Sequence, residues 1–356
     1  MKICIVTITN SCNFGGRLQN YALQEVLKVL FPDATVHTAI NVASDIKPLR
    51  YPFVYRLFEA VFSMRIAKQI SDKCVRISLL GKKIRFMQFN KKRITRSKYY
   101  LNKGKVRPGF ALAYDFYVCG SDQIWNPDFH FSSDVEYLPS VAAEKKIAYA
   151  ASFGVQHLNK EQFDFANGNI RTFAPDRISV REEAALDILQ QMGVNDAVAL
   201  LDPTLVLEPQ KWFEVEKKTD FSVPDRYVLI YMLGSAEKDE AKKYAKDHGF
   251  IPIDLGDQSQ YDYYATGPEH FVYLIHNATA VFTDSFHAMV FSIIFKRELH
   301  IYYRQGMTSR IETLFRKVQR EYALETRVLK DYEGIDVLLE KERKAALEFL
   351  RRTLSC

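Results

Sequence analysis

Residues Thr283 to Ile294, TDSFHAMVFSII, follow the apolar run Ala278 to Phe282 and join a polar turn to a strongly apolar tail. We predict a strand, a turn and a buried helix, in that order. Ser285 and His287 would then lie at or near the helix N-terminus, where free backbone N–H groups and the helix dipole favour an anion. A histidine there can donate a proton or hold an oxyanion. Alternatively, Asp284 or Ser285 only caps the helix and His287 is a structural side chain.

The segments on both sides of this stretch alternate in the same way. In the second half we predict strands at 227–234, 250–255 and 299–303 with helices at 236–248 and 268–277. In the first half we predict strands at 2–9, 110–119, 145–151 and 177–180. This alternation predicts parallel sheets, and a chain longer than roughly 250–300 residues usually needs more than one core. We therefore expect an α/β fold with two parallel-sheet domains, 1–205 and 206–330, a ligand in the cleft between them, and a bracing helix at 331–356.

The first strand is followed by a glycine-containing loop, Asn10 to Gly16, and by an amphipathic helix. Such a junction can bind a phosphate or carboxylate through backbone N–H groups, and Gly15 and Gly16 allow a close approach. Asn13 and Gln19 add polar side chains at the same place. The pattern is neither a dinucleotide-binding fingerprint nor a Walker loop, and many α/β domains begin in this way.

Two other strand ends carry polar residues. The strand at 110–119 is followed by Gly120, Ser121, Asp122 and Gln123, and the strand at 177–180 is followed by Arg181. The carboxyl ends of parallel strands form the edge at which open α/β sheets bind ligands. Asp122 either serves that site or caps the next turn. Arg181 either pairs with Glu182 or Glu183 or offers its guanidinium group to a planar anion.

Residues 47–107 are strongly basic, with 18 lysines and arginines against two acidic residues, which leaves 31 basic and 41 acidic residues, a net −10, elsewhere. We predict a basic helical insertion. Its basic residues either form a surface that faces only solvent, or form a surface that binds anionic membrane lipid or a lipid-phosphate-linked substrate. No base-reading module is present, so we do not expect a nucleic-acid partner.

Several features of the sequence predict a cytoplasmic location. The N-terminus runs directly into a strand without the features of a signal peptide, and no run of about 18 apolar residues predicts a membrane span. The five cysteines lack CxxC or metal-type spacing, which favours reduced thiols and argues against a structural zinc. We therefore expect a cytoplasmic protein without a metal site.

Seven motifs, in this order and spacing, resemble the polysaccharide pyruvyl transferase family. They are NFGGRLQNYAL from Asn13, GSDQIWN from Gly120, ASFG from Ala151, SVREE from Ser179, LDPT from Leu201, TDSFHA from Thr283 and SRIETLF from Ser309. The resemblance spans nearly the whole chain and implies a fold like that of a two-domain B-type glycosyltransferase. It implies transfer of the pyruvyl group of phosphoenolpyruvate to sugar hydroxyls as a ketal, without a metal or cofactor, on exopolysaccharide, capsule or cell-wall polymers.

The resemblance also implies roles for individual residues. His287 matches the family's catalytic histidine, Arg181 an arginine that contacts the donor, and Asp122 an acidic residue near the donor or the acceptor. To these we add Arg310, ahead of a helix predicted from Ile311, as a second anion clamp. The remaining expected substrate-binding residues are Ser285, Phe286, Asn13, Gly15, Gly16, Gln19, Ser121 and Gln123.

Two positions depart from the family pattern. Ser285 stands where some branches have arginine, so we expect a positive partner for the donor elsewhere, either Arg310 or Arg304, and Ala288 stands where glycine is common. Our leading hypothesis is a pyruvyl transferase acting on a sugar of a lipid-linked surface-glycan precursor at an anionic membrane surface. The alternatives are a nucleotide-sugar glycosyltransferase of the same layout and a non-catalytic glycan-binding protein.

Overall fold

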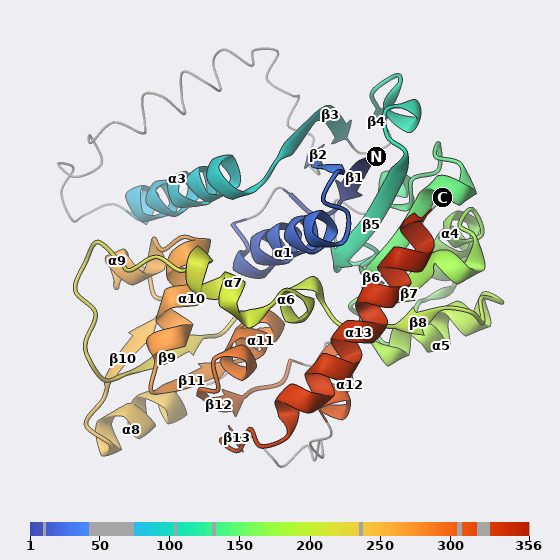
Figure 1. Cartoon of the computed structure of the whole chain (residues 1–356). Coiled ribbons are helices and arrows are strands. Elements are labelled where there is room, and N and C mark those ends of the chain that lie inside the picture. The colour runs from blue at the N-terminus through green and yellow to red at the C-terminus, as the bar shows by residue number, and fades with distance from the viewer. Residues whose placement is uncertain are drawn as a thin grey trace.

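The computed structural model describes residues 1–9, 12–42, 75–102, 105–129, 133–234, 238–304, 308–318 and 328–355. It contains two separate, mostly parallel sheets, each covered by helices (Figure 1). We call the part built on the first sheet the N-terminal unit and the part built on the second sheet the C-terminal unit. The predicted fold class, an α/β protein with two parallel-sheet domains, is confirmed.

The first sheet has the strand order β4-β3-β2-β1-β5-β6-β7-β8 and is parallel except for the β3–β4 pair. Its strands are β1 (Lys2–Val6), β2 (Thr35–Val42), β3 (Arg96–Asn102), β4 (Lys105–Val106), β5 (Phe116–Asp122), β6 (Lys146–Ala151), β7 (Ile178–Val180) and β8 (Val198–Ala199). The central strands β5 and β6 are buried along their whole length, as their apolar sequences require. The order reverses at β1, which places the carboxyl ends of β1 and β5 side by side.

The second sheet has the strand order β10-β9-β11-β12-β13 and is parallel except for the β12–β13 pair. Its strands are β9 (Tyr227–Tyr231), β10 (Ile251–Asp254), β11 (Ala280–Thr283), β12 (Glu298–Ile301) and β13 (Val328–Leu329). The strand, turn and buried helix predicted around Thr283 are present as β11 and α11 (Phe286–Ile294), and residues 286–293 of α11 are all buried.

The other helices surround these sheets and connect them. They are α1 (Phe14–Leu30), α3 (Val75–Arg93), α4 (Lys160–Ile170), α5 (Glu183–Gln191), α6 (Pro203–Val206), α7 (Pro209–Val215), α8 (Asp239–Asp247), α9 (Tyr261–Tyr264), α10 (Pro268–Asn277), α12 (Ser309–Lys317) and α13 (Ile335–Leu354). The core continues across the junction of the units, where Phe14 of α1 stacks on Phe271 of α10 with ring centroids 4.5 Å apart.

Two sequence-based predictions need correction. Gly15 and Gly16 belong to the first turn of α1 and not to the loop before it, because Asn13 caps the helix by accepting a hydrogen bond from Gly16 N. Residues 96–102 form strand β3 instead of continuing a helix, since Tyr99 and Tyr100 favour a strand and Leu101 is buried in the sheet. The predicted insertion from residue 47 lies outside the described residues as far as residue 74.

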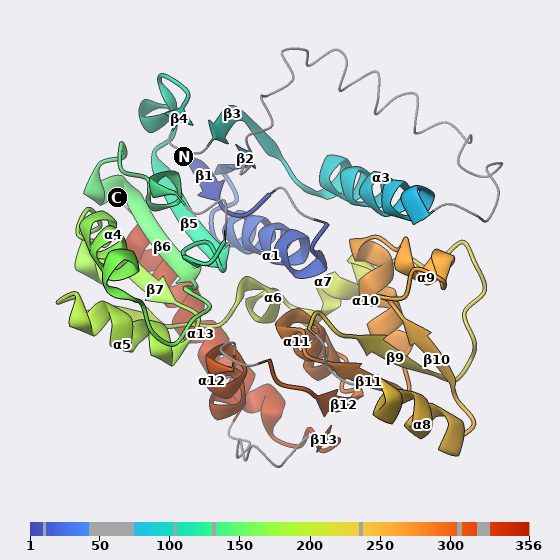
Figure 2. The same ribbon diagram turned by 180° about the vertical axis from the view of Figure 1, so that it is seen from behind.

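Two helices tie the units together. The chain leaves the N-terminal unit through α6, and α13 returns to it from the C-terminal unit (Figure 1). These two helices pack together, and Arg343 Nε of α13 donates a hydrogen bond to Leu205 O of α6 at 2.7 Å. Helix α3 belongs to the N-terminal unit by sequence but lies over α9 and α10, as both views show (Figures 1 and 2).

Within the described residues, no helix is both long enough and apolar enough to cross a membrane.

Candidate active site

The polar motifs of the two units meet at one junction. His287 is the second residue of α11, directly beyond the carboxyl end of β11, and it reaches the first turn of α1 in the other unit. A Cβ atom added to Gly15 would overlap the His287 ring, so only glycine permits this contact. Gly16 faces Asp122 less tightly, because an added Cβ would lie 3.2 Å from Asp122 Oδ2, a close contact but not an overlap. The first turn of α1 is therefore fitted to both candidate catalytic residues.

A carboxylate that the sequence analysis did not select lies at the centre of this junction. Asp202, the N-cap residue of α6, is 1% exposed. Its Oδ2 accepts hydrogen bonds from Arg181 Nη1 at 2.9 Å and Ser121 Oγ at 3.0 Å. Its Oδ1 accepts hydrogen bonds from the backbone N and the hydroxyl group of Thr204, at 3.0 and 2.6 Å. Asp202 therefore connects the end of β5, the end of β7 and the start of α6.

The same carboxylate faces His287. His287 Nε2 lies 3.6 Å from Asp202 Oδ2, which is too long for a hydrogen bond but close enough for attraction to an imidazolium ion. Burial by itself raises the pKa of Asp202, but His287, Arg181 and the hydrogen bonds from Thr204 together hold that pKa well below its ordinary value. Asp202 is therefore an anion when the protein is folded, and His287 Nε2 has no hydrogen-bond partner among the described residues.

Arg181 is held by aspartates and not by its sequence neighbours. Besides Asp202, it contacts Asp122, with Nη2 3.6 Å from Oδ1. Burial lowers its pKa, but the nearby Asp202, Asp122 and Glu182 outweigh that effect and raise it, so the guanidinium group stays charged. Of the two alternatives left open for Arg181, pairing with Glu182 or Glu183 is not observed, because Glu182 bonds to the loop after β6 and Glu183 pairs with Arg316.

Arg181 still has unused donors. Within the described parts of the chain, its Nε and Nη2 atoms have no hydrogen-bond partner although the residue is 3% exposed. Its guanidinium carbon lies 4.6 Å from the centre of the Phe286 ring. Phe286 thus supports one face of the guanidinium group, and the unused nitrogen atoms remain available to a ligand.

A second arginine shares the Phe286 ring. Arg310, the second residue of α12, is 5% exposed, and its guanidinium carbon lies 6.0 Å from the ring centre. Burial and then the neighbouring Arg181 lower its pKa to about 10. Arg304, the other candidate for a positive partner, instead lies 3.5 Å from Asp284, which accepts hydrogen bonds from Leu233 N and Gly234 N.

The other predicted site residues differ in their surroundings. Asp122 ends β5 with φ 70°, a left-handed conformation that is uncommon outside glycine and asparagine, and its Oδ1 accepts a hydrogen bond from Gln123 N at 2.9 Å. Ser285 occupies the N-cap position of α11 without a side-chain capping bond. Asn13 and Gln19 instead hold the start of α1, since Gln19 Nε2 donates to Thr7 Oγ1 and Gly16 O.

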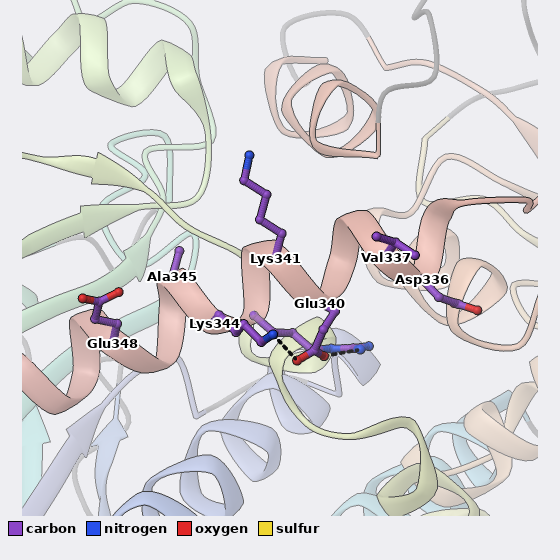
Figure 3. Close-up of a pocket in the computed structure, with 8 residues that line it drawn as sticks. Asp336, Val337, Glu340, Lys341, Lys344, Ala345 and Glu348 are labelled. Atoms are coloured by element: carbon purple, nitrogen blue, oxygen red, sulfur yellow. Dashed lines mark ion pairs between the residues drawn. The ribbon is translucent and has the colours of Figure 1, made fainter.

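A hollow of about 780 Å³ elsewhere on the surface does not include this cluster. It lies along the outer face of α13 and is lined by that helix alone (Figure 3). Glu340 there forms long ion pairs with Arg343 and Lys344, at 3.7 and 3.9 Å, and the Lys344 side chain is 75% exposed. We assign no site to it. Among the described residues no group of histidine, cysteine and acidic side chains is arranged to hold a metal ion.

The fold and the junction define a class of protein: two α/β units with buried arginine, histidine and aspartate side chains where they meet. The family model for polysaccharide pyruvyl transferase matches residues 13–303, and the chain belongs to that family. The family name describes transfer of a pyruvyl group, and it implies a sugar acceptor. No curated protein matches the chain.

Solved structures show only distant likeness. A functionally uncharacterised protein from Klebsiella pneumoniae is 12% identical with a TM-score of 0.38, over 78% of this chain and 96% of that one. The UDP-GlcNAc 2-epimerase from Neisseria meningitidis is 10% identical with a TM-score of 0.48, over 99% and 100% of the two chains. That from Methanocaldococcus jannaschii is 12% identical with a TM-score of 0.48, over 99% of each chain. Likenesses at this level carry no argument about this chain.

Proposed function

We propose that this protein transfers the pyruvyl group of phosphoenolpyruvate to two hydroxyl groups of a sugar, forming a pyruvate ketal on a precursor of a surface polysaccharide. The observation that carries the proposal is the pair of buried arginines at the junction. Arg181 Nε, Arg181 Nη2 and Arg310 Nε all lack hydrogen-bond partners among the described residues. Leaving buried guanidinium N–H groups without hydrogen-bond acceptors is costly, so this arrangement favours an anionic ligand that accepts from them.

The chemistry of phosphoenolpyruvate suits these side chains. Its carboxylate is planar and can accept two parallel hydrogen bonds from a guanidinium group, while its phosphate suits a second cation and the N–H groups of a helix N-terminus. Arg181, Arg310 and the first turn of α11 supply these features within one region. Phe286 contributes an apolar surface beside both arginines.

The proposed reaction needs two proton transfers to the donor. One sugar hydroxyl adds to C2 of the enol as a proton goes to its methylene carbon, which becomes a methyl group. A second hydroxyl then forms the other C–O bond as the C2–O bond to phosphate breaks, and the leaving phosphate receives the proton from that hydroxyl. We assign one transfer to His287, whose Nε2 is unpartnered in the described part of the protein and lies 3.6 Å from the buried carboxylate of Asp202. Asp122 is our candidate for receiving a proton from a hydroxyl.

Calorimetric titration with phosphoenolpyruvate tests the donor assignment. We expect the wild type to bind it, Arg181→Lys to bind it about tenfold more weakly because an ammonium group cannot form two parallel bonds, and His287→Ala to bind it within about threefold of the wild type. Arg171→Lys, on an exposed arginine after α4, is the matched control. Absence of binding to wild type would overturn the donor assignment, and binding of a UDP-hexose in its place would support the glycosyltransferase alternative. Absence of both would support the glycan-binding alternative.

We further propose that the acceptor is lipid-linked and that the basic segment meets the anionic membrane surface. The positive charge of the segment supports this proposal. Some of its basic side chains, however, already contact other residues of the protein. Lys82 lies over the rings of Phe14 and Tyr264, at 4.8 and 4.7 Å, and Lys92 and Arg93 pair with Glu269 at 3.2 and 3.1 Å.

Neutralising Lys82, Lys92 or Arg93 could alter folding as well as membrane binding, and the two effects could not be separated. The exposed Lys83 and Lys91 are therefore the residues to change. We expect flotation with vesicles that contain phosphatidylglycerol to be salt-sensitive and to weaken in Lys83→Gln/Lys91→Gln. Lys341→Gln/Lys344→Gln, on the exposed face of α13, is the charge-matched control. Absence of flotation by the wild type at low salt would end the membrane proposal without affecting the reaction.

A further inference from the structure

Beside the arginine cluster lies a second group of buried polar side chains. It comprises Gln123, Asn126 and Glu182, which are 9%, 1% and 0% exposed. Gln123 Nε2, Asn126 Nδ2 and Glu182 Oε2 have no hydrogen-bond partner within the described ranges of the chain. Buried polar groups in proteins are almost always hydrogen-bonded, so three unused atoms from three nearby side chains indicate a ligand.

Gly154, in the loop after β6, brings the three side chains together. Its backbone N donates to Glu182 Oε1 at 3.1 Å, and Phe153 N and the Ser152 hydroxyl donate to the same oxygen at 3.0 and 2.9 Å. An added Cβ at Gly154 would lie 2.8 Å from Asn126 Nδ2 and would overlap the Gln123 amide group. Gly154 also has φ 70°, so two requirements favour glycine here.

The protein holds the other ends of the Asn126 and Glu182 side chains in place. Asn126 Oδ1 accepts a hydrogen bond from Asp128 N at 2.9 Å, which fixes the amide so that its NH₂ group faces away from that turn. Glu182 Oε1 is fixed by its three donors, which leaves Oε2 as the free oxygen. Asn126 Nδ2 and Glu182 Oε2 are therefore the ends of anchored groups, and they can bind a ligand with little further loss of side-chain entropy.

The chemistry of the three atoms identifies the class of ligand. Two are amide NH₂ donors and one is a carboxylate oxygen, an acceptor with negative charge. A carboxylate disfavours an anion, and two NH₂ donors disfavour a cation. Neutral hydroxyl groups can both accept from the amides and donate to the carboxylate, so an uncharged polyol satisfies all three atoms.

We propose that Gln123, Asn126 and Glu182 form the subsite that binds hydroxyl groups of an uncharged pyranose acceptor, and that Glu182 excludes acidic sugars. The inference rests on the proposed transferase function and names the acceptor class for it. The subsite adjoins the donor cluster, because Glu182 directly follows Arg181 and Gln123 directly follows Asp122. Glu182 is also close enough to Arg181 and Arg310 to influence the pKa of both.

The test measures sugar binding without requiring turnover. The methyl glycosides of glucose, galactose and mannose, and the methyl glycosides of the corresponding uronic acids, are titrated by saturation-transfer NMR in the presence of phosphoenolpyruvate. We expect the wild type to bind at least one neutral glycoside and to bind its acidic counterpart about tenfold more weakly or worse.

Two nearly isosteric variants separate the atoms involved. Glu182→Gln keeps an oxygen for the three loop donors but loses the free carboxylate oxygen, and Asn126→Asp keeps the bond from Asp128 N but loses the NH₂ donor. We expect each variant to bind the neutral glycoside about tenfold more weakly than the wild type. We also expect Glu182→Gln to discriminate less against the uronic acid glycoside. Glu161→Gln and Asn159→Asp, on the exposed first turn of α4, are the matched controls and should bind like the wild type.

Failure of this inference is distinguishable from failure of the proposed function, because phosphoenolpyruvate affinity is measured on the same samples. Binding of phosphoenolpyruvate without binding of any neutral glycoside overturns the subsite alone. Unchanged glycoside binding in both Glu182→Gln and Asn126→Asp also overturns it. A third outcome is that the wild type binds a neutral glycoside but not phosphoenolpyruvate, and that both variants lose the glycoside. This result supports the subsite and contradicts the assignment of phosphoenolpyruvate as the donor.

Discussion

At the scale of single residues, the site depends on one buried carboxylate that connects the arginine to the histidine. Asp202 holds Arg181 through a 2.9 Å hydrogen bond and lies 3.6 Å from His287. A buried ion pair of this kind contributes little net stability compared with apolar packing, but removing one partner leaves an uncompensated charge. We infer that the role of Asp202 is to position the other two residues.

His287→Ala tests the proposed proton transfer. Because the ring occupies a place beside Gly15 and makes no hydrogen bond through Nε2 to the described residues, we expect the fold to persist and turnover to fall by about 10²–10⁴. Pyruvyl transfer to a sugar acceptor and circular dichroism of the same sample provide the two measurements. His157→Ala, in an exposed loop, should leave both unchanged. Wild-type turnover in His287→Ala would remove this residue from the mechanism.

Asp202→Asn tests the positioning role through stability and pH. The pKa of Asp202 is lowered in the folded protein from its ordinary value of 3.8, so the charge stabilises the fold above that pH and this stabilisation is lost on acidification. At pH 7 we expect Asp202→Asn to lose about 3–5 kcal/mol, since buried Arg181 loses its closer carboxylate partner and keeps only the longer contact with Asp122. The difference from the wild type should narrow between about pH 4 and pH 2.

Urea unfolding at neutral and acid pH measures this difference, and Asp187→Asn on the exposed face of α5 is the control. A loss below about 0.5 kcal/mol at pH 7, the usual range for a surface substitution, would contradict the role of Asp202.

At the scale of elements, helix α3 links the units by lying on α9 and α10. Arg85 Nη1 donates to Ala265 O at 2.8 Å, at the end of α9, and the helix beyond it pairs with Glu269 of α10. The first turn of α10 also contains His270, which is 6% exposed. Burial and then the nearby Arg85 lower the pKa of His270 to about 4.

The contact between α3 and α10 should therefore be acid-sensitive. His270 is neutral in the folded protein until the pH approaches 4, whereas in the unfolded chain it becomes protonated near its ordinary value of 6.5. The unfolded state thus binds more protons between these values, and stability falls as the pH drops from 6.5 to 4. We expect His270→Gln to reduce this loss, which is on the order of 2 kcal/mol. Chemical denaturation at pH 7 and pH 4.5 measures it.

The exposed His248 provides the control for that experiment, since His248→Gln should keep the acid sensitivity of the wild type. Equal pH dependence in His270→Gln and the wild type would show that protonation of His270 is not the cause.

The sequence predicted the helices and strands better than the contacts between residues that are distant in sequence. Periodic apolar residues located β11, α10 and α13 because their patterns are local and long enough to be distinctive. Strand β3 was missed because its basic residues gave the whole segment a helical, solvated character, while pairing with β2 decides its structure. Asp202 and Asn126 were not selected for the site because their surrounding sequences, LDPT and WNP, are typical of ordinary turns. Their significance comes from partners that are distant in sequence, such as Arg181 and Gly154.

At the scale of the whole molecule, α13 holds the C-terminal end of the chain to the N-terminal unit. Arg177 Nη1 donates to Thr353 O at 2.6 Å, and the rings of Tyr149 and Phe349 lie 6.4 Å apart. Leu350 is completely buried in this contact, whereas Val337 on the same helix is 75% exposed. The helix is therefore part of the core on one face and solvated on the other.

Leu350→Ala should destabilise the protein by about 2–5 kcal/mol because it leaves a cavity in packed apolar surroundings. Val337→Ala, which removes fewer carbon atoms from a solvated position, should change stability by less than about 0.5 kcal/mol. Thermal and urea unfolding of the two variants measure both effects. Equal stabilities for the two would mean that α13 does not contribute to the folded core.

The adjacency of α6 and α13 has a mechanical consequence. Two bodies joined by a single connection can rotate about many axes, but two connections that lie side by side leave only the line through both, and rotation about it must also separate the contacts of α1 and α3 with α10. Asp202 caps α6 and is bonded to Arg181 of the N-terminal unit, so it lies close to such an axis and on one side of it. His287 belongs to the other side. Rotation of the units about that line would therefore change both the distance between Asp202 and His287 and the contact of the Phe286 ring with Arg181, while the Asp202–Arg181 bond would stay intact.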